Sequence, residues 1–528
     1  MNCDARRPKR SRTAVRLTRA FGLLMLVLTV SGISIRAAAQ STDTGPNEVR
    51  KLIRKAVKLT RGESLVAAES ILRQVLVLNP ANSAAKVELA FLLTKRRRLT
   101  EAYNLAFPVA EAEPANARAF AVLGNILLIG GRFREARALF FNAIRLDRRQ
   151  HLAWAGYGMI DFYENRISES LANLNEATYQ APDEPDHLFA LAQVSSRAER
   201  YTEAADAFRH FLNVSSINDK DRRARIVSLI EFLRFLSERS SLYRSVGSDS
   251  TDVGFELDGN RPVLEVRVND LARPLRFVLD TGSGITVISD KTAALLKIKP
   301  ITRGGHAKGI GGDGKFEVVY GFLQKLDIGD IAMRNVPVYI RPFHNANQTV
   351  DGYLGLSLVS KFLTTVDYGT KRFILSKRDD DRRDFLDGNE LSLPLRLTSS
   401  GFLSGEVMVE GIESPLNFII DTGASVSVIS DQVANNQSIV PFANDEKLRV
   451  IGAAGVTEDV QSFMLPKVTF GPHSRKQIAA IALDLDIINE ASGFEQAGIL
   501  GGNFLKNYRM TFDFRNSKVI LRSIIPDN

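Results

Sequence analysis

Two short stretches each place an aspartate directly after an apolar run. In "FVLDTGSGITVIS" (residues 277–289) Asp280 follows three apolar residues, and in "FIIDTGASVSVIS" (residues 418–430) Asp421 has the same position. An ionised carboxylate at the end of a hydrophobic strand is costly unless another group compensates it. Two carboxylates a few ångströms apart cannot both ionise easily, so they share a proton and can act as acid and base together. The repetition therefore points to a pair of acids.

Other residue types that do chemistry are scarce. The only cysteine, Cys3, lies ahead of the first apolar run, so the rest of the chain has no disulfide, thiol nucleophile or thiolate metal site. The six histidines show no H-E-x-x-H spacing, and no G-x-S-x-G occurs. Carboxylate chemistry remains, and we expect neither a metal nor an organic cofactor.

The N-terminus has the order of a secretory signal peptide. A basic segment precedes the apolar run "FGLLMLVLTVSGISI" (residues 21–35), and "RAAAQ" follows with a small-residue cleavage site after Ala39. The sequence thus predicts a signal peptide over residues 1–39 and an exported protein, periplasmic or secreted. The apolar run is shorter than the ~20 residues of a membrane span, so an uncleaved anchor is the alternative. After cleavage no stable membrane span is expected.

The basic balance of the chain comes mostly from this segment. Residues 1–39 hold eight Lys or Arg and one Asp, a net charge of +7, so +2 of the total +9 remains for the rest of the chain. Nucleic-acid binding, which needs a basic surface, therefore loses its main support.

A repeat of 34 residues organises the region from 40 to 240. Its period is marked by Pro80, Pro114, Arg148, Pro182 and Ser216. Small residues recur on the same grid, at Ala56, Ala90, Gly124, Gly158 and Ala192, and again at Ala68, Ala102, Ala136, Ser170 and Ala204. Small side chains at fixed points let paired helices approach closely, and the proline ends the second helix of each pair.

This pattern resembles the tetratricopeptide repeat, and "WAGYG" (residues 154–158) fits the signature of its first helix. The resemblance implies an α-helical solenoid over residues 40–240, with five repeats over about 49–218 and a capping helix to about 240. It also implies a concave face that binds a peptide or a protein partner. The alternative is a spacer that only positions the rest of the chain.

A polar stretch, "SERSSLYRSVGSDSTD" (residues 237–252), separates this region from one of short alternating strands and frequent glycines, which is typical of an all-β unit. The charged stretch "KRDDDRRDFLDGNE" (residues 377–390) divides it into lobes over residues 253–376 and 391–528. The lobes are copies: their aspartates are 141 residues apart, "GIGG" and "GAAG" 143 apart, and "YLG" and "ILG" 146 apart.

Hydrophobic-hydrophobic-Asp-Thr-Gly-Ser/Ala resembles the active-site signature of aspartic proteases, retropepsin-like within each lobe and pepsin-like in having two lobes. The resemblance implies an all-β aspartic-protease fold of two homologous lobes, and an endopeptidase that acts on polypeptides with Asp280 and Asp421 as catalytic residues. It assigns support of the active-site turns to Thr281, Gly282, Ser283, Thr422, Gly423 and Ala424. It assigns flap tips that cover the substrate to Gly309, Ile310, Gly311, Gly312, Gly452, Ala453, Ala454 and Gly455.

One difference between the turns bears on the proton. Ser283 of the first turn corresponds to Ala424 of the second. A hydroxyl beside Asp280 can stabilise its ionised form. The sequence therefore predicts the lower pKa of the pair on Asp280 and the proton on Asp421.

Three alternatives remain open at this point. "GIGGDG" (residues 309–314) matches the dinucleotide fingerprint G-x-G-x-x-G, but the alternating "KFEVVYGF" after it predicts a strand and favours a hairpin tip. Both regions could instead form a non-catalytic scaffold that binds peptides. Each lobe could also pair with the same lobe of another chain. The 14-residue linker is long enough for pairing within one chain, so we expect a monomeric pseudo-dimer.

Overall fold

The computed structural model describes residues 45–239, 241–344, 349–377 and 391–525. The predicted signal segment and nearly all of the predicted linker at 377–390 lie outside the described residues. Among the described helices, none is both long enough and apolar enough to cross a membrane.

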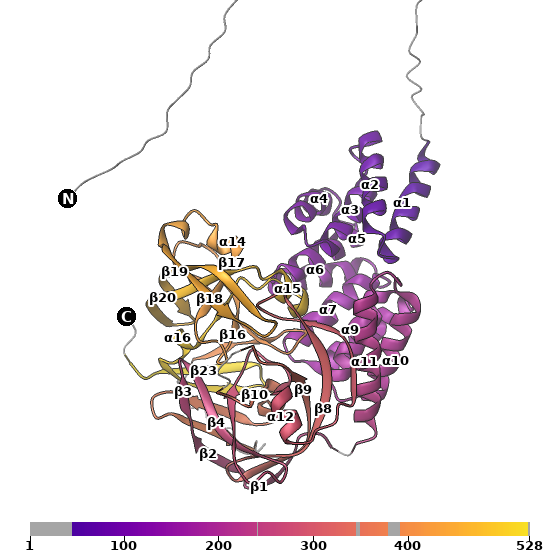
Figure 1. The fold of residues 1–528 in the computed structure, drawn as a ribbon. Coiled ribbons are helices and arrows are strands. Elements are labelled where there is room, and N and C mark those ends of the chain that lie inside the picture. Colours follow the sequence, from indigo (N-terminus) through magenta and orange to yellow (C-terminus); the bar gives the residue numbers. More distant parts are fainter. Residues whose placement is uncertain (1–44, 240, 345–348, 378–390, 526–528) are drawn as a thin grey trace, which may run out of the picture. The chain divides into compact units, whose positions relative to one another are not determined.

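The helical region is a stack of five antiparallel helix pairs followed by one longer helix (Figure 1). The helices are α1 (Pro46–Arg61), α2 (Leu65–Leu78), α3 (Ser83–Lys95), α4 (Leu99–Ala112), α5 (Ala117–Ile129), α6 (Phe133–Leu146), α7 (His151–Tyr163), α8 (Ile167–Gln180), α9 (Pro185–Arg197), α10 (Tyr201–Val214) and α11 (Lys220–Ser237). From α3 to α9 each first helix begins 34 residues after the one before. The predicted solenoid is confirmed, with α11 as its cap.

The small residues of the repeat lie where helices touch. Ala68, Ala102 and Ala136 are fully buried. A methyl group on Gly124 would lie 2.8 Å from the ring of Phe140. Interiors packed this closely do not accept extra atoms, so the period of small residues in the sequence reflects helix contact.

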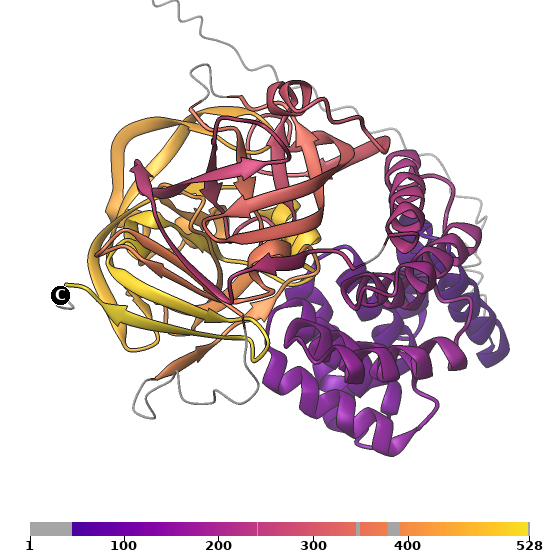
Figure 2. The same cartoon turned by 90° about the horizontal axis from the view of Figure 1, so that it is seen from below.

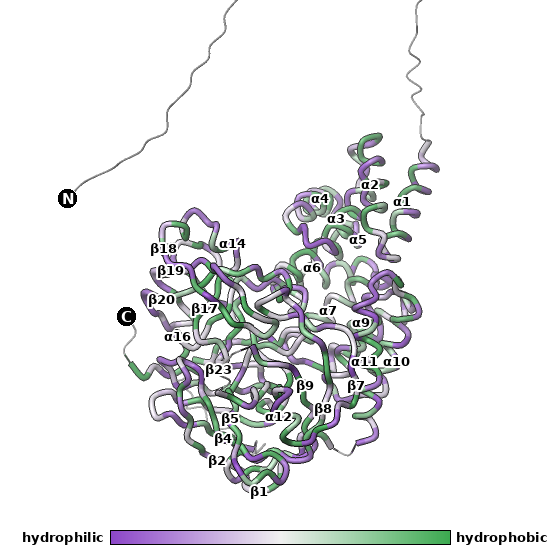
Figure 3. The backbone as a smooth tube through the Cα atoms, viewed as in Figure 1, coloured by the Kyte–Doolittle hydropathy of each residue, from purple (hydrophilic) through white to green (hydrophobic). Residues whose placement is uncertain are grey.

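The first lobe is built around a nine-stranded sheet in the order β1-β9-β6-β10-β5-β4-β8-β7, with β3 paired to β4. Its elements are β1 (Arg244–Gly247), β2 (Ser250–Gly254), β3 (Glu256–Asp258), β4 (Arg261–Val268), β5 (Leu275–Leu279), β6 (Thr286–Ser289), α12 (Asp290–Leu295), β7 (Thr302–Lys308), β8 (Lys315–Ile328), β9 (Ile331–Arg341), β10 (Gly352–Leu354), α13 (Leu356–Val359), β11 (Leu363–Asp367) and β12 (Arg372–Ser376). Hydrophobic and hydrophilic residues alternate along many of the strands (Figure 3).

The second lobe repeats this plan in an eight-stranded sheet, β14-β15-β16-β21-β17-β20-β19-β18. Its elements are β13 (Ser392–Pro394), β14 (Arg396–Leu397), β15 (Leu403–Val409), β16 (Leu416–Ile420), β17 (Ser427–Ser430), α14 (Asp431–Ala434), η1 (Val440–Phe442), β18 (Ala443–Ile451), β19 (Val456–Phe470), β20 (His473–Leu483), α15 (Asp486–Ser492), β21 (Gly498–Leu500), α16 (Gly502–Leu505), β22 (Tyr508–Asp513) and β23 (Lys518–Ser523).

A third sheet, β13-β23-β22-β11-β12-β2, takes strands from both lobes (Figure 2). At its centre β11 of the first lobe pairs antiparallel with β22 of the second, with Val366 opposite Met510. The strand pair β11–β12 at the end of the first lobe and the pair β22–β23 at the end of the second thus join the lobes within one chain.

The polar stretch that the sequence marks as a linker contains β1 and the first three residues of β2, both strands of the first lobe. β1 pairs with β9, and β2 pairs with β12. Both strands end their sheets, where one side has no strand partner and polar side chains face solvent. Because these two edge strands consist mainly of small and polar residues, their sequence predicts part of a linker instead of strands.

The capping helix α11 packs on β7 of the first lobe. Thr302 donates to Glu231 at 2.6 Å, and the rings of Phe232 and Tyr320 stack with centroids 4.2 Å apart. A methyl group on Gly305 would lie 2.5 Å from the backbone nitrogen of Arg225. The strand and the helix therefore approach at backbone distance.

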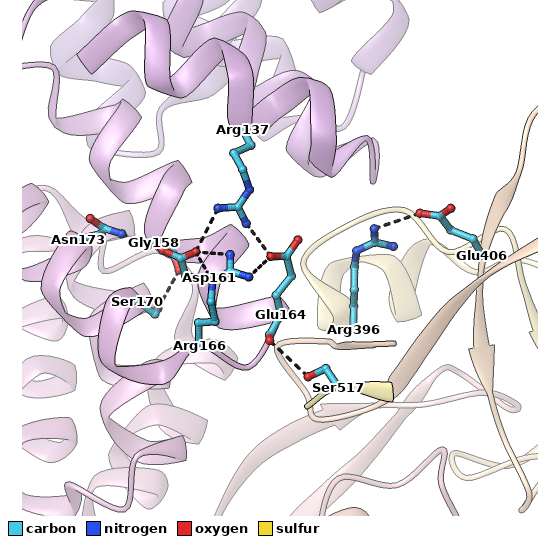
Figure 4. Close-up of polar contacts among 10 residues, drawn as sticks. All are labelled: Arg137, Gly158, Asp161, Glu164, Arg166, Ser170, Asn173, Arg396, Glu406 and Ser517. Atoms are coloured by element: carbon cyan, nitrogen blue, oxygen red, sulfur yellow. Dashed lines mark hydrogen bonds and ion pairs between the residues drawn. The ribbon is translucent and has the colours of Figure 1, made fainter. Parts of the chain in front are cut away.

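A second junction joins the solenoid to the second lobe beside an ion cluster centred on the buried Asp161 (Figure 4). Asp161 is 2% exposed and accepts from Arg137 at 3.3 Å, from Arg166 at 3.0 Å and from Asn173 at 2.8 Å. These hydrogen bonds hold the turn that follows α7. In this turn the backbone carbonyl of Glu164 accepts from the hydroxyl of Ser517 at 3.3 Å. The cluster thus orders the loop that contacts the lobe.

Candidate active site

Each predicted aspartate lies just past the end of a buried strand. Asp280 follows β5 and its backbone N–H donates to the carbonyl of Leu354 in β10 at 3.0 Å; Asp421 follows β16 and donates to Leu500 in β21 at the same distance. In the first lobe β10 lies between β5 and β6, parallel to β5 and antiparallel to β6. In the second lobe β21 lies between β16 and β17 in the same way. The two loops are therefore fixed in equivalent positions.

The threonines of the two turns cross-link the lobes. The hydroxyl of Thr281 donates to the carbonyl of Ile420 at 2.7 Å and accepts from the N–H of Thr422 at 3.0 Å. The hydroxyl of Thr422 donates to the carbonyl of Leu279 at 2.7 Å and accepts from the N–H of Thr281 at 3.2 Å. Both threonines are buried. Four hydrogen bonds thus fix the separation of the turns.

The same turns bring the two carboxyl groups together. Asp280 and Asp421 are hydrogen-bonded to each other. A methyl group on Gly282 would lie 2.4 Å from the carboxyl carbon of Asp421, and one on Gly423 would lie 2.6 Å from a carboxyl oxygen of Asp280. Each carboxyl group therefore packs against the glycine of the opposite turn. This contact leaves no space for a side chain at the glycine position.

Burial raises the pKa of both carboxyl groups. The negative charge of the neighbouring Asp421 raises the pKa of Asp280 further. Asp421 is favoured as the ionised member because backbone N–H groups of Gly423, Gly282 and Ala424 lower its pKa. Asp280 is then the protonated member, and its O–H donates to Asp421. Both aspartates keep partial solvent exposure, so water can reach them.

This order of pKa values is opposite to the sequence-based expectation. The hydroxyl of Ser283 donates to the carbonyl of Ile285 at 2.8 Å. A hydroxyl has one proton to donate, so Ser283 cannot also stabilise an ionised Asp280. The backbone of the turn accepts the hydrogen bond of this hydroxyl, which removes the basis of the expectation.

The glycine-containing segments form the tips of two hairpins, β7–β8 and β18–β19, and the tips meet. The N–H of Ala454 donates to the carbonyl of Ile310 at 2.8 Å, and the N–H of Gly312 donates to that of Val456 at 3.2 Å. Gly311, at φ +94°, would place a methyl group 2.2 Å from the carbonyl oxygen of Gly455. The predicted flap residues are thus brought together, and "GIGGDG" opens a strand, not a helix.

Arg341, at the end of β9, is a site residue that sequence reasoning missed. Its Nη1 donates to the carbonyl of Ala453 in the second hairpin tip at 3.0 Å. Its positive charge acts on Asp280 and lowers the pKa of that carboxyl. No motif contains Arg341, and only the parallel pairing of β9 with β6 brings it to the site.

The described residues contain no group of three or more His, Cys, Asp or Glu that could hold a metal ion.

One family of known proteins matches two parts of the β region. Residues 264–358 and 405–504 match the aspartyl protease family, one match in each lobe. No curated protein matches the sequence.

Solved structures resemble part of the chain. A thermophilic TPR protein of Thermus thermophilus shows 21% identity and a TM-score of 0.30, over 34% of this chain and 98% of that one. PilF of Pseudomonas aeruginosa shows 17% identity and a TM-score of 0.28, over 36% of this chain and 86% of that one.

Proposed function

Since both lobes match the aspartyl protease family, we propose that the chain is an aspartic endopeptidase that hydrolyses peptide bonds with water activated by Asp280 and Asp421. The observation that carries the proposal is the hydrogen bond between the two carboxyl groups at the junction of the lobes. Two acids with different pKa values in one site can act as base and acid in the same step.

In the proposed reaction Asp421 accepts a proton from water, and the resulting hydroxide attacks the carbonyl carbon of the scissile peptide. Asp280 gives its proton to the carbonyl oxygen, so a neutral tetrahedral diol forms. Collapse of the diol breaks the C–N bond as the nitrogen takes the proton held by Asp421. A hydroxyl proton of the diol returns to Asp280, and the products are a carboxylic acid and an amine.

The hairpin tips would hold the peptide over the two acids. The hydrogen bond between Ala454 and Ile310 joins the two tips. In the proposed mechanism the tips separate before a polypeptide enters. Closure over the substrate would exclude bulk water and strengthen the electrostatic action of the acids.

The same chain supplies both halves of the site, which supports a monomeric pseudo-dimer. The threonine cross-links and the pairing of β11 with β22 are all made within one chain. The solenoid would bind a protein partner or part of the substrate. The N-terminal segment supports export to the periplasm or the medium.

The test is cleavage of a peptide library by the purified full chain and by the variants Asp280→Asn and Asp421→Asn. Asp290→Asn is a matched control, because this exposed aspartate follows β6 in the same lobe. We expect the chain and the control to cleave and both dyad variants to lose cleavage. Peptide binding without cleavage by the unmodified chain would favour the non-catalytic scaffold.

A further inference from the structure

The two halves of the proposed site have different chemistry at equivalent positions. Arg341 pairs with Ser289 where β9 meets β6, and the corresponding residue of the second lobe, opposite Ser430, is Leu483. Tyr353 of β10 likewise corresponds to Ile499 of β21, since each lies opposite the residue two positions before its aspartate. The lobes therefore present a cation and a phenol on one side and aliphatic groups on the other.

The aliphatic side is a continuous apolar cluster. Leu483 and Ile499 are at most 9% exposed and belong to one packed group with Ile481 and Ile488. Ile310 from the tip of the first hairpin and Ala424 beside Asp421 pack against it. Its partly buried edge, which includes Ile310 and Ala424, would contact an aliphatic or other apolar side chain of a bound peptide.

The cationic side surrounds Arg341 with rings. The guanidinium carbon lies 5.0 Å from the ring centre of Phe343, 5.5 Å from that of Phe316 and 5.7 Å from that of Tyr353. These contacts stabilise a cation only modestly. Burial lowers the pKa of Arg341, yet a guanidinium stays protonated in proteins.

Arg341 has no carboxylate partner among the described residues. Its hydrogen bonds there are made by Nη1, to the carbonyls of Ala453 at 3.0 Å and Pro342 at 3.4 Å. A partly buried cation without an anion is costly and is usually paired. The charge of Arg341 acts on the carboxyl group of Asp280, but within the described part of the chain no ion pair or hydrogen bond joins the two side chains.

We propose that Arg341 is a specificity residue that binds a carboxylate side chain of the substrate, so that the site cleaves between an acidic residue on one side of the bond and an apolar residue on the other. The inference rests on the proposed function and names its substrate class. With the hairpin tip lifted from Arg341, the fork of Nη1, Nη2 and Nε can take the carboxylate in two parallel hydrogen bonds. The substrate carboxylate takes the place of the Ala453 carbonyl as the acceptor of the Arg341 hydrogen bond. Substrate binding and release of the hairpin tip therefore occur together.

The test uses peptides that differ only by Glu or Gln, placed on either side of one cleavage site with leucine opposite. The chain is compared with Arg341→Met, Arg341→Lys and the control Arg334→Met, an exposed arginine of the same strand. We expect the unmodified chain and the control to prefer Glu over Gln by about tenfold or more in kcat/KM, mainly through KM. Arg341→Met should lose the preference, and Arg341→Lys should keep part of it because the charge remains.

A binding measurement separates this inference from the proposed hydrolysis. The Asp421→Asn variant, with and without Arg341→Met, is titrated with the Glu and Gln peptides. Tighter binding of Glu only when Arg341 is present supports the inference even if no variant cleaves. Equal affinity for the two peptides, no binding of either, or a Glu preference that survives in Arg341→Met overturns it.

Discussion

Removal of the Thr422 hydroxyl is the sharpest structural perturbation of the site. Thr422 is fully buried, and its hydroxyl donates to the Leu279 carbonyl at 2.7 Å and accepts from the Thr281 N–H at 3.2 Å. Valine has nearly the same shape but no polar group. Thr422→Val therefore leaves one buried carbonyl and one buried N–H without their partner.

Each unsatisfied buried group costs about 1–3 kcal/mol, so the two together should destabilise the lobes by about 2–6 kcal/mol. For a unit of this size 1 kcal/mol corresponds to about 2–4 °C in Tm, so the loss should be at least about 4 °C. Thr422→Ser keeps the hydroxyl and removes one methyl group, which should cost about 1 kcal/mol.

The assay is thermal unfolding followed by near-UV circular dichroism, together with peptide cleavage at a temperature where all variants are folded. We expect Thr422→Val to lose more stability and more activity than Thr422→Ser. Thr365→Val is a second control, because within the described ranges the Thr365 hydroxyl bonds only to the Thr511 hydroxyl, at 2.9 Å. If Thr422→Val unfolds at the same temperature as Thr422→Ser, the cross-link does not hold the turns.

Four further results follow from the geometry. Gly282→Ala should reduce kcat about 100-fold, because the new methyl group would lie 2.4 Å from the carboxyl carbon of Asp421 and would displace that carboxyl group. An unchanged kcat would contradict this contact. Ser283→Ala should leave both limbs of the pH–rate profile in place, since its hydroxyl bonds to a backbone carbonyl; a displaced acidic limb would restore the earlier assignment. Folding raises the pKa of Asp280. The contribution of the neutral carboxyl group to the free energy of unfolding is therefore fully present below the pKa of the unfolded chain, about 3.9, and is lost as the pH rises through the pKa of the folded chain. Asp280→Asn should therefore gain Tm relative to the unmodified chain between pH 4 and 7, and a difference independent of pH would refute this. Glu231→Ala, which removes the acceptor of the β7 hydroxyl, should speed hydrogen exchange in the β7–β8 hairpin but not in β18–β19; equal exchange would show that α11 does not steady the first hairpin.

The sequence reveals those parts of the fold that repeat. The small residues of the solenoid recur because each pair of helices meets at the same point, as the buried Ala68 and Ala102 show. The Asp-Thr-Gly turns recur because both lobes must present the same backbone to each other. A physical constraint that acts twice leaves the same letters twice, so the lobes and the pair of acids could be predicted.

Contacts made once leave no such trace. Arg341 reaches the site only through the parallel pairing of β9 with β6. The stacking of Phe232 on Tyr320 joins residues that no local pattern links. Ser283 shows the opposite error, because a local inference missed the competing carbonyl of Ile285. Long-range pairing and competition for one proton are properties of the folded chain.

The pH dependence of kcat/KM on an uncharged peptide tests the shared proton between Asp280 and Asp421 most directly. The proposed mechanism predicts a bell-shaped profile, because one acid must be ionised and the other protonated. Its alkaline limb should lie well above the ordinary aspartate pKa of about 3.9, since burial and the neighbouring carboxylate hold the proton on Asp280. A profile with a single limb, or a bell that persists in Asp421→Asn, would contradict the account.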